Sequence, residues 1–281
     1  MSKIVELFGI STVSRNADWK SLVQAQGCPY LRGSCIKVRK SRPSVAIGTC
    51  TLSCGRQQVP IIVCPNRLLE RHQIFMDCLH LLTNHTPGNE MHILREISIP
   101  GGNVDFVLAS VNGRKVHDFV AIELQSMDTT GTVWPERQRF LKTMGIAVGA
   151  RDASSAKKFG INWKMTAKTT LVQMHHKIQT FEYINKHLVL VMQDYLLRYM
   201  QREFRFGHMH PAKLGDSMQI HAYNLGKEDG SYKMALAARL STDTAGVAQC
   251  LGLQANPRLE LADILRQLEA KISDRTLFEL R

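Results

Sequence analysis

The 281-residue sequence predicts an α/β (α+β) protein in which a mixed central sheet is flanked by helices. Three observations predict this class. Residues 94–126 carry strand patterns separated by tight turns, and residues 164–184 carry the apolar spacing of a long helix. The continuous apolar run Leu188–Met192 is typical of a strand buried in the middle of a sheet. No stretch approaches the roughly 18 to 20 apolar residues that span a bilayer, so we do not expect this chain to be a membrane protein.

Positive charge is concentrated near the amino terminus. The chain has 36 Lys and Arg residues against 24 Asp and Glu, a formal charge of +12. No acidic residue occurs between Trp19 and Leu69, where eight basic residues lie: Lys20, Arg32, Lys37, Arg39, Lys40, Arg42, Arg56 and Arg67. A basic patch of this kind favours a polyanionic partner, usually nucleic acid. A solvated basic surface without a partner is the alternative.

Five cysteines fall inside this basic segment: Cys28, Cys35, Cys50, Cys54 and Cys64. In an intracellular chain such a cluster indicates a metal site before it indicates disulfides, and thiolates on a metal could stabilise a loop-rich region. Cys28 and Cys64 are each followed by proline, which suggests two equivalent arms of one metal site. Cys35 and Cys50 would complete the set of four ligands. Cys54 is the alternative partner of Cys50, and free or buried thiols are the interpretation without metal.

The sequence therefore divides into residues 1–66, a loop-rich metal-binding module, and residues 67–281, the main core with its interface elements. Between the two cysteine arms, Ile36–Ser44 is too charged to be buried. We expect its side chains Lys37, Arg39, Lys40 and Arg42 to contact phosphates or guanine edges.

A helix from Arg67 to about Leu82 is predicted next, followed by strands over residues 94–99, 103–111 and 115–126. Pro100-Gly101-Gly102 and Asn112-Gly113 are the expected hairpin turns. Near the carboxyl end, a helix over about residues 259–272 has an apolar stripe typical of a core or a dimer interface.

Asp105 lies in the second of these strands, and Glu123 and Gln125 lie two residues apart in the third, so both point to one face. A regular two-residue loop at Asn112-Gly113 would place Asp105 on the opposite face. The apolar residues argue against that register, because those of both strands can share one core only if a bulge or an odd loop shifts the pairing. The shifted register gathers Asp105, Glu123 and Gln125 on one face, where a divalent cation would offset the carboxylates.

This is the arrangement of a PD-(D/E)xK nuclease site, with Gln125 where lysine is commonest. Further motifs accompany it: Cys28-Pro-x5-Cys35, Lys37-Val-Arg-Lys-Ser-Arg-Pro43, Ile47-Gly-Thr-Cys50, Val63-Cys64-Pro65 and Ala121-Ile-Glu-Leu-Gln-Ser-Met-Asp-Thr-Thr-Gly-Thr132. Through these motifs the sequence resembles the NotI-type type II restriction endonucleases over about residues 28–132.

The resemblance implies a PD-(D/E)xK restriction-endonuclease-like core and Mg²⁺-dependent cleavage of a GC-rich palindrome in double-stranded DNA, leaving 5′-phosphates. Asp105 and Glu123 would bind Mg²⁺, and Gln125 would stand at the lysine position. Glu96 is the preferred additional acid, with Glu90 as the alternative. The family pattern also implies a structural iron or zinc on four cysteines, a homodimer, a partner methyltransferase and a prokaryotic cytoplasm.

Two other functions fit the same residues. One is a DNA repair or junction nuclease of the same fold, which cuts by structure instead of sequence. The other is a non-enzymatic, metal-stabilised DNA-binding protein in which Asp105 and Glu123 are structural. Mg²⁺ dependence separates the second from the nucleases, and fixed fragment ends separate the two nucleases.

Overall fold

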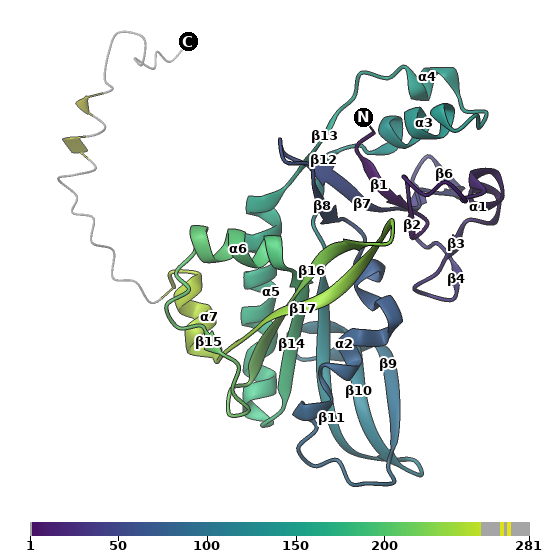
Figure 1. Ribbon diagram of the computed structural model, residues 1–281. Coiled ribbons are helices and arrows are strands. Elements are labelled where there is room, and N and C mark those ends of the chain that lie inside the picture. Colours follow the sequence, from purple (N-terminus) through teal and green to yellow (C-terminus); the bar gives the residue numbers. More distant parts are fainter. Residues whose placement is uncertain (1, 254–264, 267–268, 271–281) are drawn as a thin grey trace.

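A seven-stranded mixed sheet forms the centre of the computed structural model, which describes residues 2–253, 265–266 and 269–270. The strand order is β15-β17-β16-β14-β11-β10-β9 (Figure 1). The strands are β9 (Glu90–Ile99), β10 (Gly102–Asn112), β11 (Lys115–Gln125), β14 (His187–Gln193), β15 (His210–Pro211), β16 (Met218–Glu228) and β17 (Ser231–Thr242). Strands β11, β14 and β16 are parallel, and the other pairs are antiparallel. The predicted mixed sheet, with Leu188–Met192 at its middle, is confirmed.

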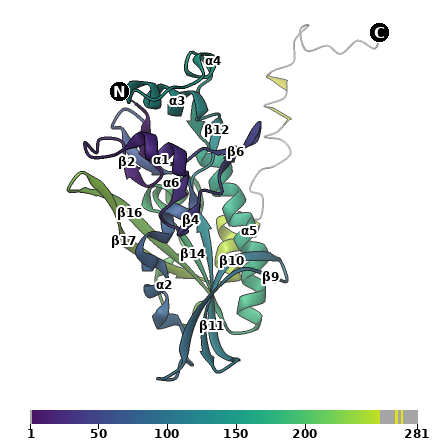
Figure 2. The same ribbon diagram turned by 90° about the vertical axis from the view of Figure 1, so that its right-hand side faces the viewer.

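Helices cover both faces of the sheet. The long helix α5 (Trp163–Tyr183) lies on the connection from β11 to the parallel strand β14, where the sequence predicts a helix. Figure 2 shows α5 on one side of β10 and β11 and α2 (Gln73–Met76) on the other. The remaining helices are α1 (Trp19–Ala25), α3 (Trp134–Thr143), α4 (Ala150–Ala153), α6 (Asp194–Glu203) and α7 (Thr244–Cys250). None in the described part of the chain is long and apolar enough to cross a membrane.

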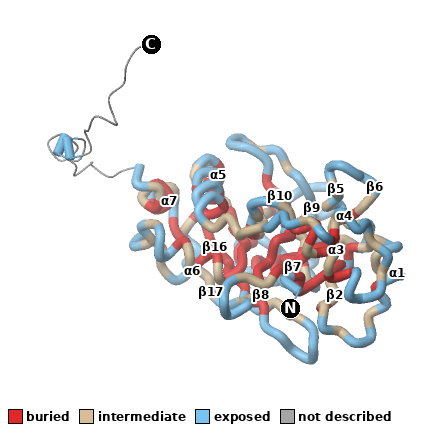
Figure 3. Tube along the Cα trace, turned by 90° about the horizontal axis from the view of Figure 1, so that it is seen from above, coloured by how far each residue is buried: buried red, intermediate tan, exposed pale blue. Residues whose placement is uncertain are grey.

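Two apolar clusters form on the two faces of the sheet. Phe106, Leu108, Val120 and Ile122 pack in one cluster, as the pattern of alternation predicts. The opposite face is also buried, since Val107, Ala109 and Ala121 of the sheet pack in a second cluster with residues of α5. Figure 3 shows buried residues along the central strands and exposed residues around the periphery.

The amino-terminal region has more regular structure than the loop-rich module that the sequence predicts. A four-stranded sheet has the order β2-β1-β7-β8. Its strands are β1 (Ile4–Leu7), β2 (Ile10–Ser11), β7 (Thr49–Cys54) and β8 (Val59–Ile62), and two small hairpins join β3 (Gly27–Cys28) to β4 (Gly33–Ser34) and β5 (Val38–Arg39) to β6 (Arg42–Ala46). Ile4, Leu7, Leu52 and Ile61 are almost fully buried between these strands and the main cluster. Paired strands with apolar side chains therefore give this region a hydrophobic core of its own.

The single helix predicted from Arg67 to Leu82 is wrong. The chain forms the 3₁₀ helix η1 (Pro65–His72), the short helix α2, and the 3₁₀ helix η2 (Leu79–Leu81). The helical path breaks where Glu70 is extended and Arg71 and His72 are left-handed, with φ of 51° and 56°. This break brings the Glu70 carboxylate against Arg67 and against the backbone N–H of Met234.

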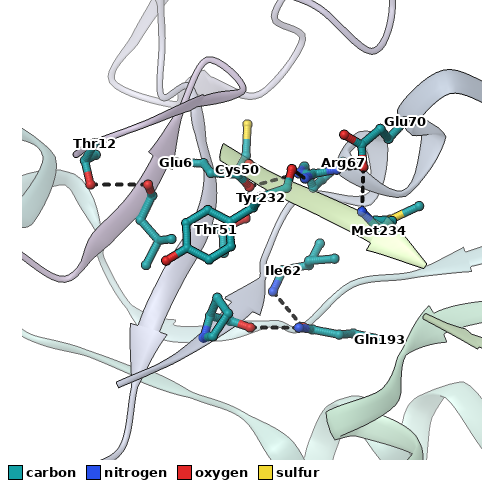
Figure 4. A network of polar contacts seen from close by, with 12 residues as sticks. Glu6, Thr12, Cys50, Thr51, Ile62, Arg67, Glu70, Gln193, Tyr232 and Met234 are labelled. Carbon is teal, nitrogen blue, oxygen red and sulfur yellow. Dashed lines mark hydrogen bonds and ion pairs between the residues drawn. The ribbon is translucent and has the colours of Figure 1, made fainter. Parts of the chain in front are cut away.

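Arg67 lies at the centre of a buried polar network (Figure 4). Its guanidinium donates to Glu6 of β1 at 2.9 Å, to Glu70 at 3.0 Å, and to the Tyr232 carbonyl of β17 at 2.9 Å. Arg67 is therefore not part of the basic surface to which the sequence assigns it. The network connects the amino-terminal sheet to η1 and to the central sheet.

The residues after β11 include the short strand β12 (Thr129–Gly131), which pairs with β13 (Phe159–Ile161). The helix expected over residues 259–272 lies largely outside the described residues, so its proposed role in an interface stays a prediction.

Candidate active site

A β-bulge sets the register of β10 and β11. Next to the turn, Asn112 pairs with Lys115 and Val111 with Val116, but from Ser110 onward the pairing shifts by one residue, to Ser110 with Asp118 and Phe106 with Ile122. This confirms the shifted register that the apolar pattern predicts. Continued by one residue, it places Asp105 directly across from Glu123.

Glu96 extends this row onto β9. Val104 pairs with Ile97 and Phe106 with Arg95, so Glu96 stands across from Asp105. Glu90, the alternative acid, lies instead across from Val111. Six positions of a strand separate the two glutamates, about 20 Å. The structure therefore brings Glu96, and not Glu90, to the level of Asp105 and Glu123.

Burial acts on both carboxyls, and a neighbouring negative charge adds to its effect on each. Burial raises the pKa of Asp105, while the N–H of Leu124, which donates to it at 2.8 Å, and the charge of Lys177 partly oppose the shift. The negative charge of Glu96 adds to the increase. Burial raises the pKa of Glu123 to about 7, and the charge of Asp105 contributes. Two partly desolvated carboxyls, each with its pKa raised further by a neighbouring negative charge, are a natural site for a cation.

Helix α5 contributes two polar side chains that the sequence reasoning missed. Lys177 Nζ lies 2.5 Å from Glu123 Oε1, with both side chains about nine-tenths buried, and Thr170 Oγ1 donates to Gln125 Oε1 at 2.9 Å. Thr170 and Lys177 are seven residues apart, so two turns of helix place both over β11. The sequence does contain one indication of this contact: Lys177 is a charged residue three positions after Met174, which lies on the predicted apolar stripe of α5.

Gln125 is held at both ends of its amide. Its Nε2 donates to the carbonyl of Ser126 at 2.6 Å, and its oxygen lies 2.9 Å from Thr170 Oγ1, whose single hydrogen is shared with the Thr166 carbonyl at 2.7 Å. The amide orientation is therefore defined, and one Nε2 hydrogen is left for a further acceptor. A neutral amide here can orient a water or a phosphate oxygen but adds no positive charge.

The cysteines form a second cluster. Cys50 and Cys64 affect each other in opposite directions: Cys50 and nearby Lys37 lower the pKa of Cys64, while Cys64 raises the pKa of Cys50. Burial raises the pKa of Cys28, and the charges of Cys64 and Cys35 add to it. The four preferred cysteines therefore act on one another electrostatically. Cys54 lies four residues along β7 from Cys50, about 13 Å away.

As the described side chains stand, no three His, Cys, Asp or Glu residues are close enough to form a metal site. The chemistry of both sets nevertheless fits a metal. Carboxylates with raised pKa suit a hard cation such as Mg²⁺, and a cysteine of lowered pKa beside other thiols suits zinc or iron.

The predicted DNA-contacting residues lie around two adjoining cavities of about 580 and 720 Å³, between the β5–β6 loop and helices α3 and α4. Lys40 and Arg42 are exposed. Arg39 is paired with Asp152 at 3.0 Å and stacks over Trp134, and Lys37 donates to the Val63 carbonyl. Arg151 and Lys157 also line these cavities and add to the basic surface.

An antiparallel β9-β10-β11 unit, a crossover helix and a parallel β14, with carboxylates facing one another on β10 and β11, is consistent with a restriction-endonuclease-like fold. The sequence model of the family described as restriction endonuclease NotI matches residues 19–225, well over half of the chain. The protein belongs to this family, which makes it a site-specific deoxyribonuclease that binds double-stranded DNA. The resemblance seen in the sequence is thereby confirmed. A comparison with curated proteins gave no match.

Proposed function

We propose that the protein is a type II restriction endonuclease that uses Mg²⁺ to cut both strands of a GC-rich palindrome and leaves 5′-phosphates. The observation that supports this most is the pairing across β10 and β11, in which Asp105 and Glu123 face each other and the charge of Asp105 adds to the raised pKa of Glu123. The unit β9-β10-β11-α5-β14 would then be a PD-(D/E)xK core.

In this site Asp105 and Glu123 would hold Mg²⁺, with Glu96 as the further acid. The bound ion would supply a more acidic water and positive charge beside the phosphate. The Leu124 N–H fixes the carboxylate of Asp105, and Thr170 fixes the amide of Gln125, which can then orient a water or a phosphate oxygen. Hydrolysis adds water across the P–O3′ bond and gives a 5′-phosphate and a 3′-hydroxyl.

The function is tested with unmethylated phage DNA, with and without Mg²⁺. We expect discrete fragments that require Mg²⁺, and the same short sequence at every sequenced end. A smear with random ends would instead support the structure-directed repair or junction nuclease. Pre-treatment of the DNA with the methyltransferase that we expect as the functional partner should abolish the bands.

Residues 1–66 are proposed as the DNA-contacting module, and residues 67–281 as the catalytic core with its interface elements. The exposed Lys40 and Arg42 beside the two basic cavities support a phosphate contact there, with Lys37 and Arg39 behind them. A palindromic site has two-fold symmetry, which a homodimer matches, so we propose that two chains act together.

A structural zinc or iron on Cys28, Cys35, Cys50 and Cys64 is proposed for the same module. Protein purified without chelator should contain about one iron or zinc per chain, since four thiolates complete a tetrahedral site. Cys64→Ser should lose this metal, and Cys54→Ser should keep it because Cys54 lies far along β7. Elemental analysis decides the question, and equal metal contents in the two variants would contradict the proposed ligand set.

A further inference from the structure

Lys177 is a buried lysine beside the proposed catalytic carboxylates. Its ammonium forms an ion pair with Glu123 and also donates to the Asn103 carbonyl of β10 at 2.5 Å. It therefore touches both strands that carry the acids, and its charge acts on Asp105 as well as on Glu123. A buried charge with two fixed partners has a defined position.

The turn between β9 and β10 holds this part of α5 in place. Gly101 has φ of 94°, and a Cβ added there would lie 2.5 Å from the His176 carbonyl oxygen. Thr180 Oγ1 of α5 donates to the Pro100 carbonyl at 2.9 Å. The Pro100-Gly101-Gly102 turn thus packs directly on the helical turn that carries Lys177, and this contact fixes the height of the ammonium above β10 and β11.

The charges around the site point to a role for this lysine. Glu96, Asp105 and Glu123 carry three negative charges when ionised, and Lys177 reduces the sum to two, the charge that one divalent cation neutralises. Gln125 adds none. Without Lys177, the site would keep an excess negative charge even with one cation bound, and this charge would repel the DNA phosphate.

We propose that Lys177 supplies the positive charge that Gln125 cannot, orienting Glu123 in the free enzyme and offsetting the negative charge that develops on the scissile phosphate. This inference rests on the proposed function, in which Asp105 and Glu123 form the active site. Lys177 lies on helix α5, yet it thereby supplies the charge that a lysine at position 125, two residues after Glu123, would supply.

The test compares Lys177→Met, which keeps the length of the side chain, with Lys177→Gln, which keeps N–H donors without charge. Single-turnover cleavage by both variants should be about 100-fold slower, the order expected for loss of one charge-stabilising group. The DNA concentration for half-maximal rate should stay within about 3-fold, because substrate binding is distributed over many phosphate contacts. Lys177→Arg should recover most of the lost rate, since it restores the charge.

A readout without cleavage separates electrostatics from damage to the fold. In calorimetry without DNA, Lys177→Gln should bind Mn²⁺ at least as tightly as the wild type, because a competing positive charge is gone. Distortion of the site would weaken Mn²⁺ binding instead, and that result would overturn the inference. Lys186→Met is the matched control: it removes the Lys186–Asp118 ion pair at 2.6 Å, on the same strand β11, and should cleave at the wild-type rate.

Glu123→Gln, assayed in parallel, separates a failure of the role proposed for Lys177 from a failure of the active-site assignment. If Glu123→Gln is inactive while Lys177→Met and Lys177→Gln cleave within about 3-fold of the wild type, well short of the loss expected for a charge-stabilising group, the role of Lys177 is wrong and the active site stands. If Glu123→Gln itself cleaves normally, the active-site assignment fails, and this inference fails with it.

Discussion

Replacing Asp105 by asparagine is expected to slow DNA cleavage by about 10³-fold or more while leaving DNA binding in Ca²⁺ nearly unchanged. An asparagine oxygen can still accept the hydrogen bond from the Leu124 N–H that Asp105 accepts at 2.8 Å, so the β10–β11 geometry should persist. What is lost is one of the two negative charges facing each other across the strands. The rate is measured on a short duplex that contains the cleavage site, under single-turnover conditions with Mg²⁺.

The glutamates of β9 provide the matched comparison for this experiment. Glu96→Gln should also impair cleavage, because Glu96 lies across from Asp105 and its charge acts on that carboxyl. Glu90→Gln, on the same strand but across from Val111, should leave the rate unchanged. Equal losses in both glutamate variants, or full activity of Asp105→Asn, would contradict the assignment of the site to this level of the sheet.

The pairing of Asp105 with Glu123 could be predicted from the sequence because one-residue shifts in register have large consequences. A strand that slips by one position exchanges its buried and exposed faces, so the apolar residues of β10 and β11 allow only the bulged pairing. The bulge between Ser110 and Val111 is the local solution to that requirement. Glu96 could not be placed by this argument, because β9 is exposed over most of its length and Glu96 itself has a left-handed φ of 52°. Its position across from Asp105 follows from the observed pairing of β9 with β10.

Lys177 could not be placed in the same way. Its contact with Glu123 spans 54 residues, and the sequence gives no register between a helix and the sheet that it covers. Helical periodicity identifies the buried stripe of α5, but a lysine next to that stripe can equally extend to solvent along its own aliphatic stem. The packing of the Gly101 turn against His176, together with the apolar residues of α5 that pack on the sheet, places this ammonium over β11.

The incorrect prediction of a single helix over residues 67–82 has the same cause, namely contacts between residues that lie far apart in the sequence. Its apolar spacing is genuinely helical, and local propensity contains no reason for a break after Leu69. A distant partner accompanies the break: Glu70 accepts a hydrogen bond from the Met234 N–H of β17, and here the chain has an extended residue followed by two left-handed ones. Partners that lie 61 and 165 residues from Arg67 along the chain thus override local helix propensity.

The cost of removing Arg67 is expected to be large. Arg67→Met should lower the free energy of unfolding by about 3 to 5 kcal/mol, because the carboxylate of Glu6 would be left buried without its counter-charge. Arg67 is 0% exposed and Glu6 only 2%, so water cannot replace the lost hydrogen bonds. Urea unfolding in EDTA, followed by circular dichroism, measures the change without a contribution from bound metal.

Lys233→Met is the matched control, because it removes an ion pair with Glu228 whose two side chains are 36% and 59% exposed. Solvent screens such a pair, and its loss should cost less than about 1 kcal/mol. Similar costs in the two variants would mean that the Arg67 network is hydrated and contributes no more than a surface pair. A large cost for Arg67→Met alone would show that the buried network, whose other partners lie on β1, η1 and β17, stabilises the fold far more than a surface ion pair does.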